Sequence, residues 1–326
     1  MMDNLIANFT KQMAEAIEIG KAVKLSPRHK EIRNVVVAGL GGSGIGANLV
    51  AELISAKMKL PFVVCKDYSL PEFADEHTLL IVSSYSGNTE ETLHAMEDGI
   101  KRTCKIICIT SGGSMVALAK KAALDVVIIP GGMPPRSCLA YSFIQQLFVL
   151  SYYNLIDDGF IVGIKEAISH LDKEEKRIIK QAKSIAKKIN KKMIVLYSAA
   201  NMEAVSMRWR QQLNENSKVL CWHHVIPEMN HNELVGWRAP GKYAVILLRN
   251  DTDYSRIQQR MNIAKNIISQ YTPNIIEIYS KGDSFIEKSL FLIHLGDWVS
   301  YFLAEIRKVD PVEVNVIEYL KAELAN

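Results

Sequence analysis

This chain has little of several features that would assign it to a class of protein. Its 326 residues contain no apolar run of the roughly 18 residues that a helix needs to cross a bilayer. The 5 cysteines are odd in number and several lie in apolar runs, which favours buried thiols in a reducing cytosol over a disulfide framework. A net charge of only +4 suits a small anionic ligand and is too weak to indicate nucleic acid. We therefore expect a cytoplasmic protein that binds neither nucleic acid nor a membrane.

Signals for secretion and for metal binding are equally weak. Residues 1–23 contain acids and lysines where a signal peptide needs an unbroken apolar core, so we expect an amphipathic helix there. Cys104 and Cys108 are spaced wrongly for a zinc knuckle, and no second pair completes one. His223 and His224 lie near the end of an expected strand, where a structural role is the simplest interpretation. We expect no metal site.

The first half of the chain has the pattern of an α/β domain. Five short apolar runs are expected to be strands, at 34–40, 61–67, 79–85, 104–110 and 125–130. Helices are expected between them near 44–57, 88–102 and 115–123, with Asn88 or Thr89 as the N-cap of the second. Continuous apolar strands separated by helices indicate a parallel sheet that is covered on both faces.

The second half repeats this pattern. A buried helix at 142–156 and a charged helix at about 164–190 precede further strands, expected at 193–199, 218–224, 243–249 and 275–280. The two series align, so we expect two doubly wound α/β domains, 1–155 and 156–326. The second copy lacks the glycine-serine turn and the serine cluster of the first. Ligand binding is therefore expected in the first domain, with the second supplying walls and catalytic side chains.

The glycine-rich stretch "VVVAGLGGSGIG", residues 35–46, follows the first expected strand. Its spacing Gly39-x-Gly41-x-x-Gly44 matches the dinucleotide fingerprint, and Asp67 lies about 20 residues further on, where a ribose-binding acid would be. An NAD-dependent oxidoreductase is thus one interpretation of the loop. A tight strand-to-helix turn without a ligand is another.

A second polar loop, "SSYSGNTEET" at 83–92, follows the third expected strand. Ser84, Ser86 and Thr89 lie in this loop directly before a helix, where hydroxyls and free N–H groups can bind a phosphate dianion. Such residues are also common in plain caps and turns. However, both loops leave the carboxyl edge of one sheet near its switch point. Together they favour a site for a single phosphate over a site for a pyrophosphate.

These two loops resemble those of the sugar isomerase (SIS) domain family. Three further stretches, "PPRSCLAYSF" (134–143), "QLNENSK" (212–218) and "PEMNHNELVGW" (227–237), make the whole chain similar to the bifunctional phosphoglucose/phosphomannose isomerases. The resemblance implies a homodimer of chains with two flavodoxin-like domains, and no metal or cofactor. It also implies an intramolecular oxidoreductase that isomerises glucose 6-phosphate and fructose 6-phosphate, and mannose 6-phosphate too, through a cis-enediolate.

The resemblance also implies a role for individual residues. By motif, the phosphate-binding positions are Gly42, Ser43, Ser84, Ser86 and Thr89. Histidine can both accept and donate a proton near neutral pH, which suits ring opening of the sugar. A glutamate can carry a proton between two carbons, and an arginine can stabilise an enediolate without losing its own proton.

The catalytic positions fall mainly in the second half of the chain. Glu215 matches the catalytic base, and His231, which Glu233 could orient, matches the ring-opening residue that comes from the partner subunit. Arg136 matches the residue beside the reacting carbons, which also contacts the substrate, and Lys321 matches a C-terminal lysine that assists ring opening. From spacing alone, a surface glutamate is the favoured interpretation of Glu215, and Arg136 could equally be a surface arginine. A sugar-phosphate sensor without catalysis is a further alternative, since it would keep the serine loop without needing Glu215 or His231.

Overall fold

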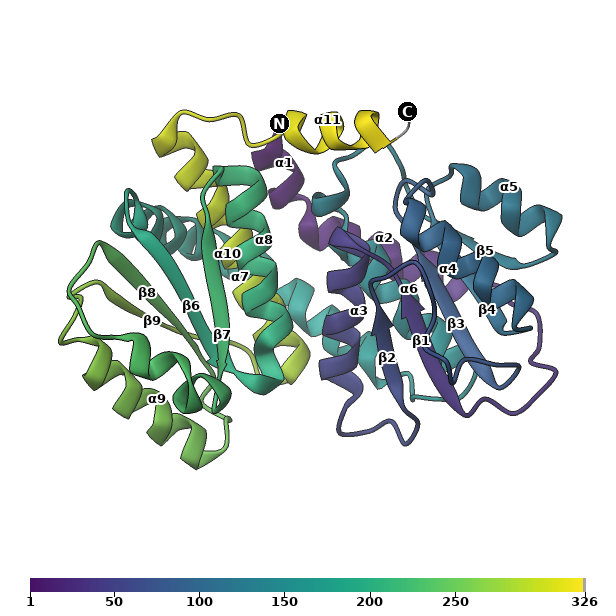
Figure 1. Cartoon of the computed structure of the whole chain (residues 1–326), viewed down its shortest axis with the longest axis horizontal. Helices are drawn as coiled ribbons and strands as arrows, with labels where there is room; N and C mark the ends of the chain where they lie inside the picture. The colour runs from purple at the N-terminus through teal and green to yellow at the C-terminus, as the bar shows by residue number, and fades with distance from the viewer. Residues whose placement is uncertain (325–326) are drawn as a thin grey trace. The chain divides into compact units, whose positions relative to one another are not determined.

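The five strands expected in the first half form one parallel sheet in the computed structural model, which describes residues 1–324. They are β1 (Asn34–Ala38), β2 (Phe62–Cys65), β3 (Thr78–Ser83), β4 (Lys105–Thr110) and β5 (Asp125–Ile128). Their order is β2-β1-β3-β4-β5, and every neighbouring pair is parallel (Figure 1). All six residues of β3 are buried, as expected for a strand with helices on both faces.

Helices cover this sheet on both faces. They are α2 (Phe9–Ala22), α3 (Gly41–Ile54), α4 (Glu90–Lys101), α5 (Ser114–Lys121) and α6 (Leu139–Tyr152), with a 3-10 turn η1 (Pro135–Ser137) before α6. The apolar faces of α4 and α5 pack on the sheet through Met96 and Met115. Helix α6 packs against both α2 and α3, and Gly20 and Gly46 permit this because each lies directly against an α6 side chain.

The second half forms a smaller parallel sheet with the order β7-β6-β8-β9 (Figure 1). Its strands are β6 (Met193–Ala199), β7 (Cys221–Ile226), β8 (Tyr243–Arg249) and β9 (Ile275–Tyr279). The helices of this half, with the N-terminal helix that joins its unit, are α1 (Met2–Ala7), α8 (Glu203–Ser217), α9 (Ser255–Ile268), α10 (Phe285–Arg307) and α11 (Asn315–Leu324). Strand β7 begins later than expected, because α8 continues to Ser217 and Lys218 then turns the chain with a φ of 55°.

The chain divides into two compact units. The first unit is Asn8–Ile168, and the second is Met1–Ala7 together with the residues from Ser169 onward. The division lies within the long helix α7 (Gly159–Ile189), which is later in the chain than residue 155. The N-terminal helix expected over 1–23 is interrupted at Asn8, so that α1 belongs to the second unit and α2 to the first.

Two further findings bear on the expectations from composition. All 5 cysteines are free, four of them are buried, and Cys221 is half-buried. Among the helices of residues 1–324, none combines the length and the apolar character that a membrane span requires. The α/β fold with two parallel sheets flanked by helices is confirmed.

Candidate active site

The glycine loop joins β1 to the start of α3. Gly41 has a φ of +52° and no atom within 4 Å of where a Cβ would lie, so the backbone there is open and favours glycine. Gly44 packs tightly, because its Cβ would lie 2.5 Å from the carbonyl oxygen of Gly39. Ser43 is buried in the first turn of α3. The N–H groups of Ser43 and Gly44 both bond to the carbonyl oxygen of Leu40 at 3.1 Å. The fingerprint spacing therefore reflects a close strand-to-helix turn, in which Gly41 and Gly42 provide the first N–H groups of the helix.

The serine loop leaves β3, which pairs directly with β1. The hydroxyls of Ser84 and Thr89 are hydrogen-bonded at 2.8 Å, and Ser84 Oγ also accepts from the N–H of Gly87 at 3.2 Å. Ser86 Oγ accepts from the N–H of Asn88 at 3.2 Å. Thr89 is the N-cap of α4, as expected by position, but its hydroxyl bonds to Ser84 instead of capping the helix. Three hydroxyls are thus held in one short turn.

A third loop, residues 110–113, packs against the backbone of the serine loop. Gly87 has a φ of +67°, and a Cβ there would lie only 1.8 Å from the carbonyl oxygen of Gly112. Ser111 donates to the carbonyl oxygen of Tyr85 through both its N–H (3.0 Å) and its hydroxyl (2.6 Å). This loop keeps the serine turn in one conformation. The sequence gives no local signal of this role, because Ser111 and Tyr85 are 26 residues apart in the chain.

The turn that carries Arg136 packs against the same edge of the sheet. A Cβ on Gly42 would lie 2.9 Å from the carbonyl oxygen of Pro135 and 3.7 Å from the N of Arg136, so glycine allows α3 to approach this turn. Tyr85 links the turn to the serine loop, because its hydroxyl accepts from the N–H of Met133 at 3.1 Å. Burial raises the pKa of Tyr85, so its hydroxyl stays protonated. Arg136 is 4% exposed, in contrast to the surface arginine that spacing alone allowed.

Six of the predicted site residues therefore lie at one edge of the first unit's sheet. The residues of this phosphate edge are Gly42, Ser43, Ser84, Ser86, Thr89 and Arg136. The edge lies at the switch point, since α3 leads from β1 to β2 on one side while β3 pairs on the other. Asp67, the residue weighed for a ribose, is exposed and accepts the N–H of Tyr68 at 2.7 Å in an ordinary turn.

Glu215 lies in the last turn of α8, in the second unit, and is half-buried. The two residues that follow Glu215 attach this end of α8 to Ser300 on α10. Asn216 Nδ2 donates to Ser300 Oγ at 2.9 Å, and Ser217 Oγ donates to the carbonyl oxygen of Ser300 at 2.6 Å. About two turns earlier in α8, a buried ion pair joins Arg208 to Asp297 at 2.9 Å. The residues around Glu215 thus anchor α8 to α10.

His231 ends the 3-10 turn η3 (Glu228–His231), which follows β7, and its side chain is exposed. The expectation that Glu233 orients His231 is not what the structure shows. Glu233 instead accepts from Trp222 Nε1 at 3.0 Å and from the hydroxyl of Tyr197. Burial is the main cause that raises the pKa of Tyr197, and the neighbouring carboxylate of Glu233 raises it further. Glu233 therefore anchors the loop, residues 228–236, to the sheet.

His223, His224 and Lys321 are the remaining residues that the sequence singled out. His223 Nε2 lies 3.7 Å from Glu203 Oε1, and His224 Nδ1 accepts the N–H of Val225 at 2.8 Å. Within residues 1–324, no group of three His, Cys, Asp or Glu side chains could hold a metal ion. Lys321 lies on α11, a helix with no buried residue.

Glu215 and His231 lie at opposite ends of β7. Helix α8 runs back along the sheet, so Glu215 is close to the start of β7, whereas His231 follows its end. The six residues of β7 span about 20 Å at roughly 3.3 Å per residue. A single hexose therefore cannot contact Glu215 and His231 of the same chain.

Comparison with known proteins identifies the family of the chain. The family described as the bacterial phospho-glucose isomerase C-terminal SIS domain matches residues 178–324. The bifunctional phosphoglucose/phosphomannose isomerase of Caldicellulosiruptor bescii is 38% identical over 331 aligned residues, which cover 98% of each chain. This chain belongs to the bifunctional phosphoglucose/phosphomannose isomerase family.

Other members and more distant structures agree with this assignment. The bifunctional phosphoglucose/phosphomannose isomerase of Aquifex aeolicus is 37% identical over 90% of both chains. The C-terminal domain of glucosamine-fructose-6-phosphate aminotransferase from Francisella tularensis has the same fold, with a TM-score of 0.75, 12% identity and coverage of 96% and 97%. Membership of the isomerase family favours neither the NAD-dependent oxidoreductase nor the non-catalytic sensor.

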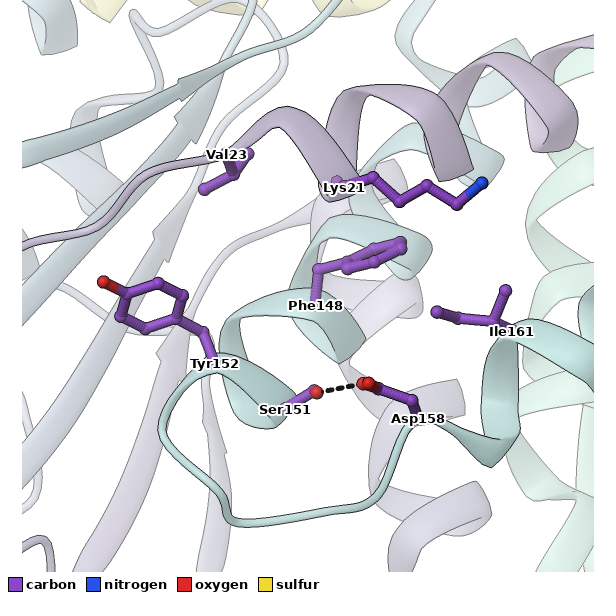
Figure 2. A pocket seen from close by; sticks show the side chains of 8 residues that line it. Lys21, Val23, Phe148, Ser151, Tyr152, Asp158 and Ile161 are labelled. Atoms are coloured by element: carbon purple, nitrogen blue, oxygen red, sulfur yellow. Dashed lines mark hydrogen bonds between the residues drawn. The ribbon is translucent and has the colours of Figure 1, made fainter.

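A separate cavity of about 270 Å³ lies between α2, α6 and the start of α7 in the first unit (Figure 2). Phe148, Val23 and Ile161 give it an apolar lining, and Lys21 and Asp158 lie at its rim. Ser151 donates to Asp158, as the dashed line in Figure 2 marks. Gly20 and Tyr152 complete the lining, and none of the predicted site residues belongs to it.

Proposed function

We propose that this protein is an aldose–ketose isomerase that interconverts glucose 6-phosphate and fructose 6-phosphate, and also mannose 6-phosphate and fructose 6-phosphate. The observation that supports this best is the phosphate edge, where a turn with three hydroxyls lies beside the N-terminus of α3. Such an edge fits one phosphate dianion. The family membership of the whole chain supplies the reaction.

The phosphate edge binds the 6-phosphate of the sugar. Ser86 donates its hydroxyl, and so does one member of the Ser84–Thr89 pair, since the proton of the other is used in the bond between them. Ser43 and the first N–H groups of α3 complete the site. Gly42 contributes by its lack of a side chain, which keeps α3 against the turn that carries Arg136. The phosphate thus fixes the sugar chain relative to Arg136.

Glu215 transfers the proton of the isomerisation. Its carboxylate removes the proton from C2 of the open-chain aldose, and the same proton returns to C1 as the hydroxyl proton moves from O2 to O1. The intermediate is a cis-enediolate, whose oxygens Arg136 stabilises because a guanidinium retains its protons. From fructose 6-phosphate, protonation on either face of C2 gives glucose 6-phosphate or mannose 6-phosphate.

Ring opening requires a second copy of the chain. Because Glu215 and His231 lie at opposite ends of β7, the site that contains Glu215 receives the partner subunit's His231, and Lys321 assists it. This gives a homodimer with two equivalent sites, in which each chain contributes to both. Neither step needs a metal or a cofactor in this scheme.

A coupled assay tests the activity. Purified protein with fructose 6-phosphate and no added metal should form glucose 6-phosphate, detected as it is oxidised by a dehydrogenase. With mannose 6-phosphate as substrate, the same detection should follow through fructose 6-phosphate. Absence of turnover with correctly folded wild-type protein would contradict the proposed function.

Mixing two inactive variants tests the shared site. Glu215→Gln and His231→Ala each remove one contributor, and random reassociation makes about half of the dimers mixed, each with one intact site. We expect recovery of about a quarter of the wild-type activity, because only one of the two sites in a mixed dimer is complete. Mixed dimers that remain inactive would show that Glu215 and His231 of one chain serve the same site.

A further inference from the structure

Lys218 occupies an unusual position at the end of α8. It has a φ of 55° and a ψ of 45°, the left-handed conformation in which helices commonly end with glycine. Its N–H bonds to the carbonyl oxygen of Leu213, which closes the helix. Lys308 ends α10 in the same conformation with an exposed side chain, so what distinguishes Lys218 is the set of contacts that its ammonium group makes.

The ammonium group of Lys218 joins two segments of the second unit. Its Nζ donates to the carbonyl oxygen of Glu215 at 2.5 Å and to the carbonyl oxygen of Glu313 at 2.6 Å. The carboxylate of Glu313 lies 3.8 Å from the same Nζ. The side chains of Lys218 and Glu313 are 27% and 34% exposed, so the contacts are partly shielded from water. Lys218 thus binds the residue proposed as the base and a residue ahead of α11.

Glu313 also contacts the first residue of α11. Its Oε1 accepts the N–H of Asn315, the first residue of α11, at 2.7 Å, while its Oε2 faces Lys218. Because α11 has no buried residue, packing within the chain does little to fix its start. The contacts of Lys218 and Glu313 therefore connect the end of α8 to the start of the helix that carries Lys321.

We propose that Lys218 is a positioning residue, which holds Glu215 and the start of α11 in one fixed arrangement so that the proton-transfer and ring-opening groups meet the same sugar. The inference rests on the proposed function. Arg307 secures the turn independently, since its Nε donates to the carbonyl oxygen of Ser217 at 3.0 Å. The fold of the turn therefore does not depend on the ammonium group.

The test compares Lys218→Met with Lys308→Met. Lys308 is a matched control, because it also has a left-handed conformation, at the end of α10, and its side chain is exposed. We expect Lys218→Met to lower kcat about tenfold or more, since a shift of about 1 Å in a reacting group is costly. KM should change less than about twofold, because the phosphate edge belongs to the other unit. Lys308→Met should change neither.

Two further variants separate positioning from folding. Lys218→Arg keeps a donor of similar reach and should recover most of kcat. Lys218→Gly removes the side chain and also relieves the left-handed backbone, so it should lower kcat while the melting temperature stays close to that of the wild type. If kcat falls in Lys218→Gly only in step with a lower melting temperature, Lys218 has a structural role and the inference fails.

A double-variant cycle shows whether Lys218 acts through the C-terminal helix. In a Lys321→Ala background, Lys218→Met should cost clearly less than it costs in the wild type, because one of the two groups it positions is already missing. Equal costs in both backgrounds would overturn the inference, as would a Lys218→Met variant with unchanged kcat. An inactive wild type would instead refute the proposed function, so the two failures are distinguishable.

Discussion

The two units share one sheet topology but differ in the loop that follows the corresponding strand. In the first unit this loop follows β3 and contains Ser84, Ser86 and Thr89. In the second it follows β8 and contains Asp251 and Asp253. Both loops leave the carboxyl edge of a parallel sheet ahead of a helix, the position at which such folds bind ligands. The same backbone position therefore carries hydroxyls in one unit and carboxylates in the other.

The acidic loop of the second unit is neutralised by its own chain. Lys288, 4% exposed, donates to Asp251 Oδ1 at 2.9 Å and to Thr252 Oγ1 at 3.2 Å. Asp253 is buried, and burial raises its pKa to about 6. Carboxylates at this position would repel a phosphate dianion. The comparison indicates that a few loop residues decide whether this position of the shared fold is suited to an anion.

The units differ also in where they supply functional groups. All the predicted residues of the first unit lie at the carboxyl edge of its sheet, whereas Glu215 lies near the opposite edge of the second sheet. The proposed function accordingly assigns phosphate binding to the first unit and proton transfer to the second. The predictions below test that division, beginning with the largest expected effect.

Removing the proposed base should have the largest effect. Glu215→Gln should lower kcat by on the order of a thousandfold, because general acid–base catalysis is lost while the size of the side chain is kept. The coupled assay measures this. Glu203→Gln, at the other end of α8, is a matched control that should keep full activity. Glu215→Gln with full activity would show that another group carries the proton.

Making the serine loop acidic should abolish phosphate binding. Ser86→Asp gives the first unit a carboxylate like those of the second, and should raise KM for fructose 6-phosphate about a hundredfold through like-charge repulsion. Ser86 is exposed, so the fold should tolerate the change. Ser86→Asn is the uncharged control and should raise KM far less. Equal KM values for the two variants would contradict a phosphate site at this loop.

Filling the space at Gly42 should affect both stability and catalysis. Gly42→Ala places a Cβ 2.9 Å from the carbonyl oxygen of Pro135, and should cost about 1–3 kcal/mol of unfolding free energy through overpacking. The displaced turn should also lower kcat about tenfold by moving Arg136.

Gly46→Ala, one turn further along α3, is the control for this prediction. Its Cβ would lie 2.8 Å from Ser142 Oγ, so it also tightens the packing but leaves Arg136 in place. We expect some loss of stability with little change in kcat. Denaturant unfolding and the coupled assay measure the two quantities, and equal losses of kcat in both variants would contradict the role of Gly42.

The smallest effect should come from neutralising Asp253. Its pKa is raised from 3.8 to about 6 in the folded protein, so the folded state retains a proton that the unfolded state loses. Unfolding free energy should therefore fall as the pH rises through this window. Asp253→Asn should remove this dependence and be more stable than the wild type at pH 7.5, with activity unchanged. Asp251 is the exposed partner of Lys288, so Asp251→Asn should not show this gain in unfolding free energy.

Much of the fold could be predicted from the sequence. Each strand is a short apolar run, and burial on both faces of a parallel sheet produces that pattern locally, as in β3. Ends were less predictable, since the late start of β7 depends on how Lys218 closes α8. The break at Asn8 depends on two helices that belong to different units. Contacts of this kind are tertiary and leave no local periodicity.

The candidate site divides in the same way. The serine and glycine loops could be found because their residues are adjacent in the sequence and the sheet topology brings the loops together. The partners of Glu233 could not be predicted from the sequence, because Tyr197 lies on β6 and Trp222 on β7, and only the fold brings them to Glu233. For the same reason, neither the supporting loop 110–113 nor the contacts of Lys218 could be predicted from spacing.

The most direct test of the division between the units is calorimetric titration of fructose 6-phosphate into Glu215→Gln. If the first unit binds the phosphate and Glu215 acts only in proton transfer, the variant should bind with a Kd within about threefold of the wild-type value. Loss of binding by a variant that remains folded would show that Glu215 holds the substrate, and would contradict the division of labour between the two units.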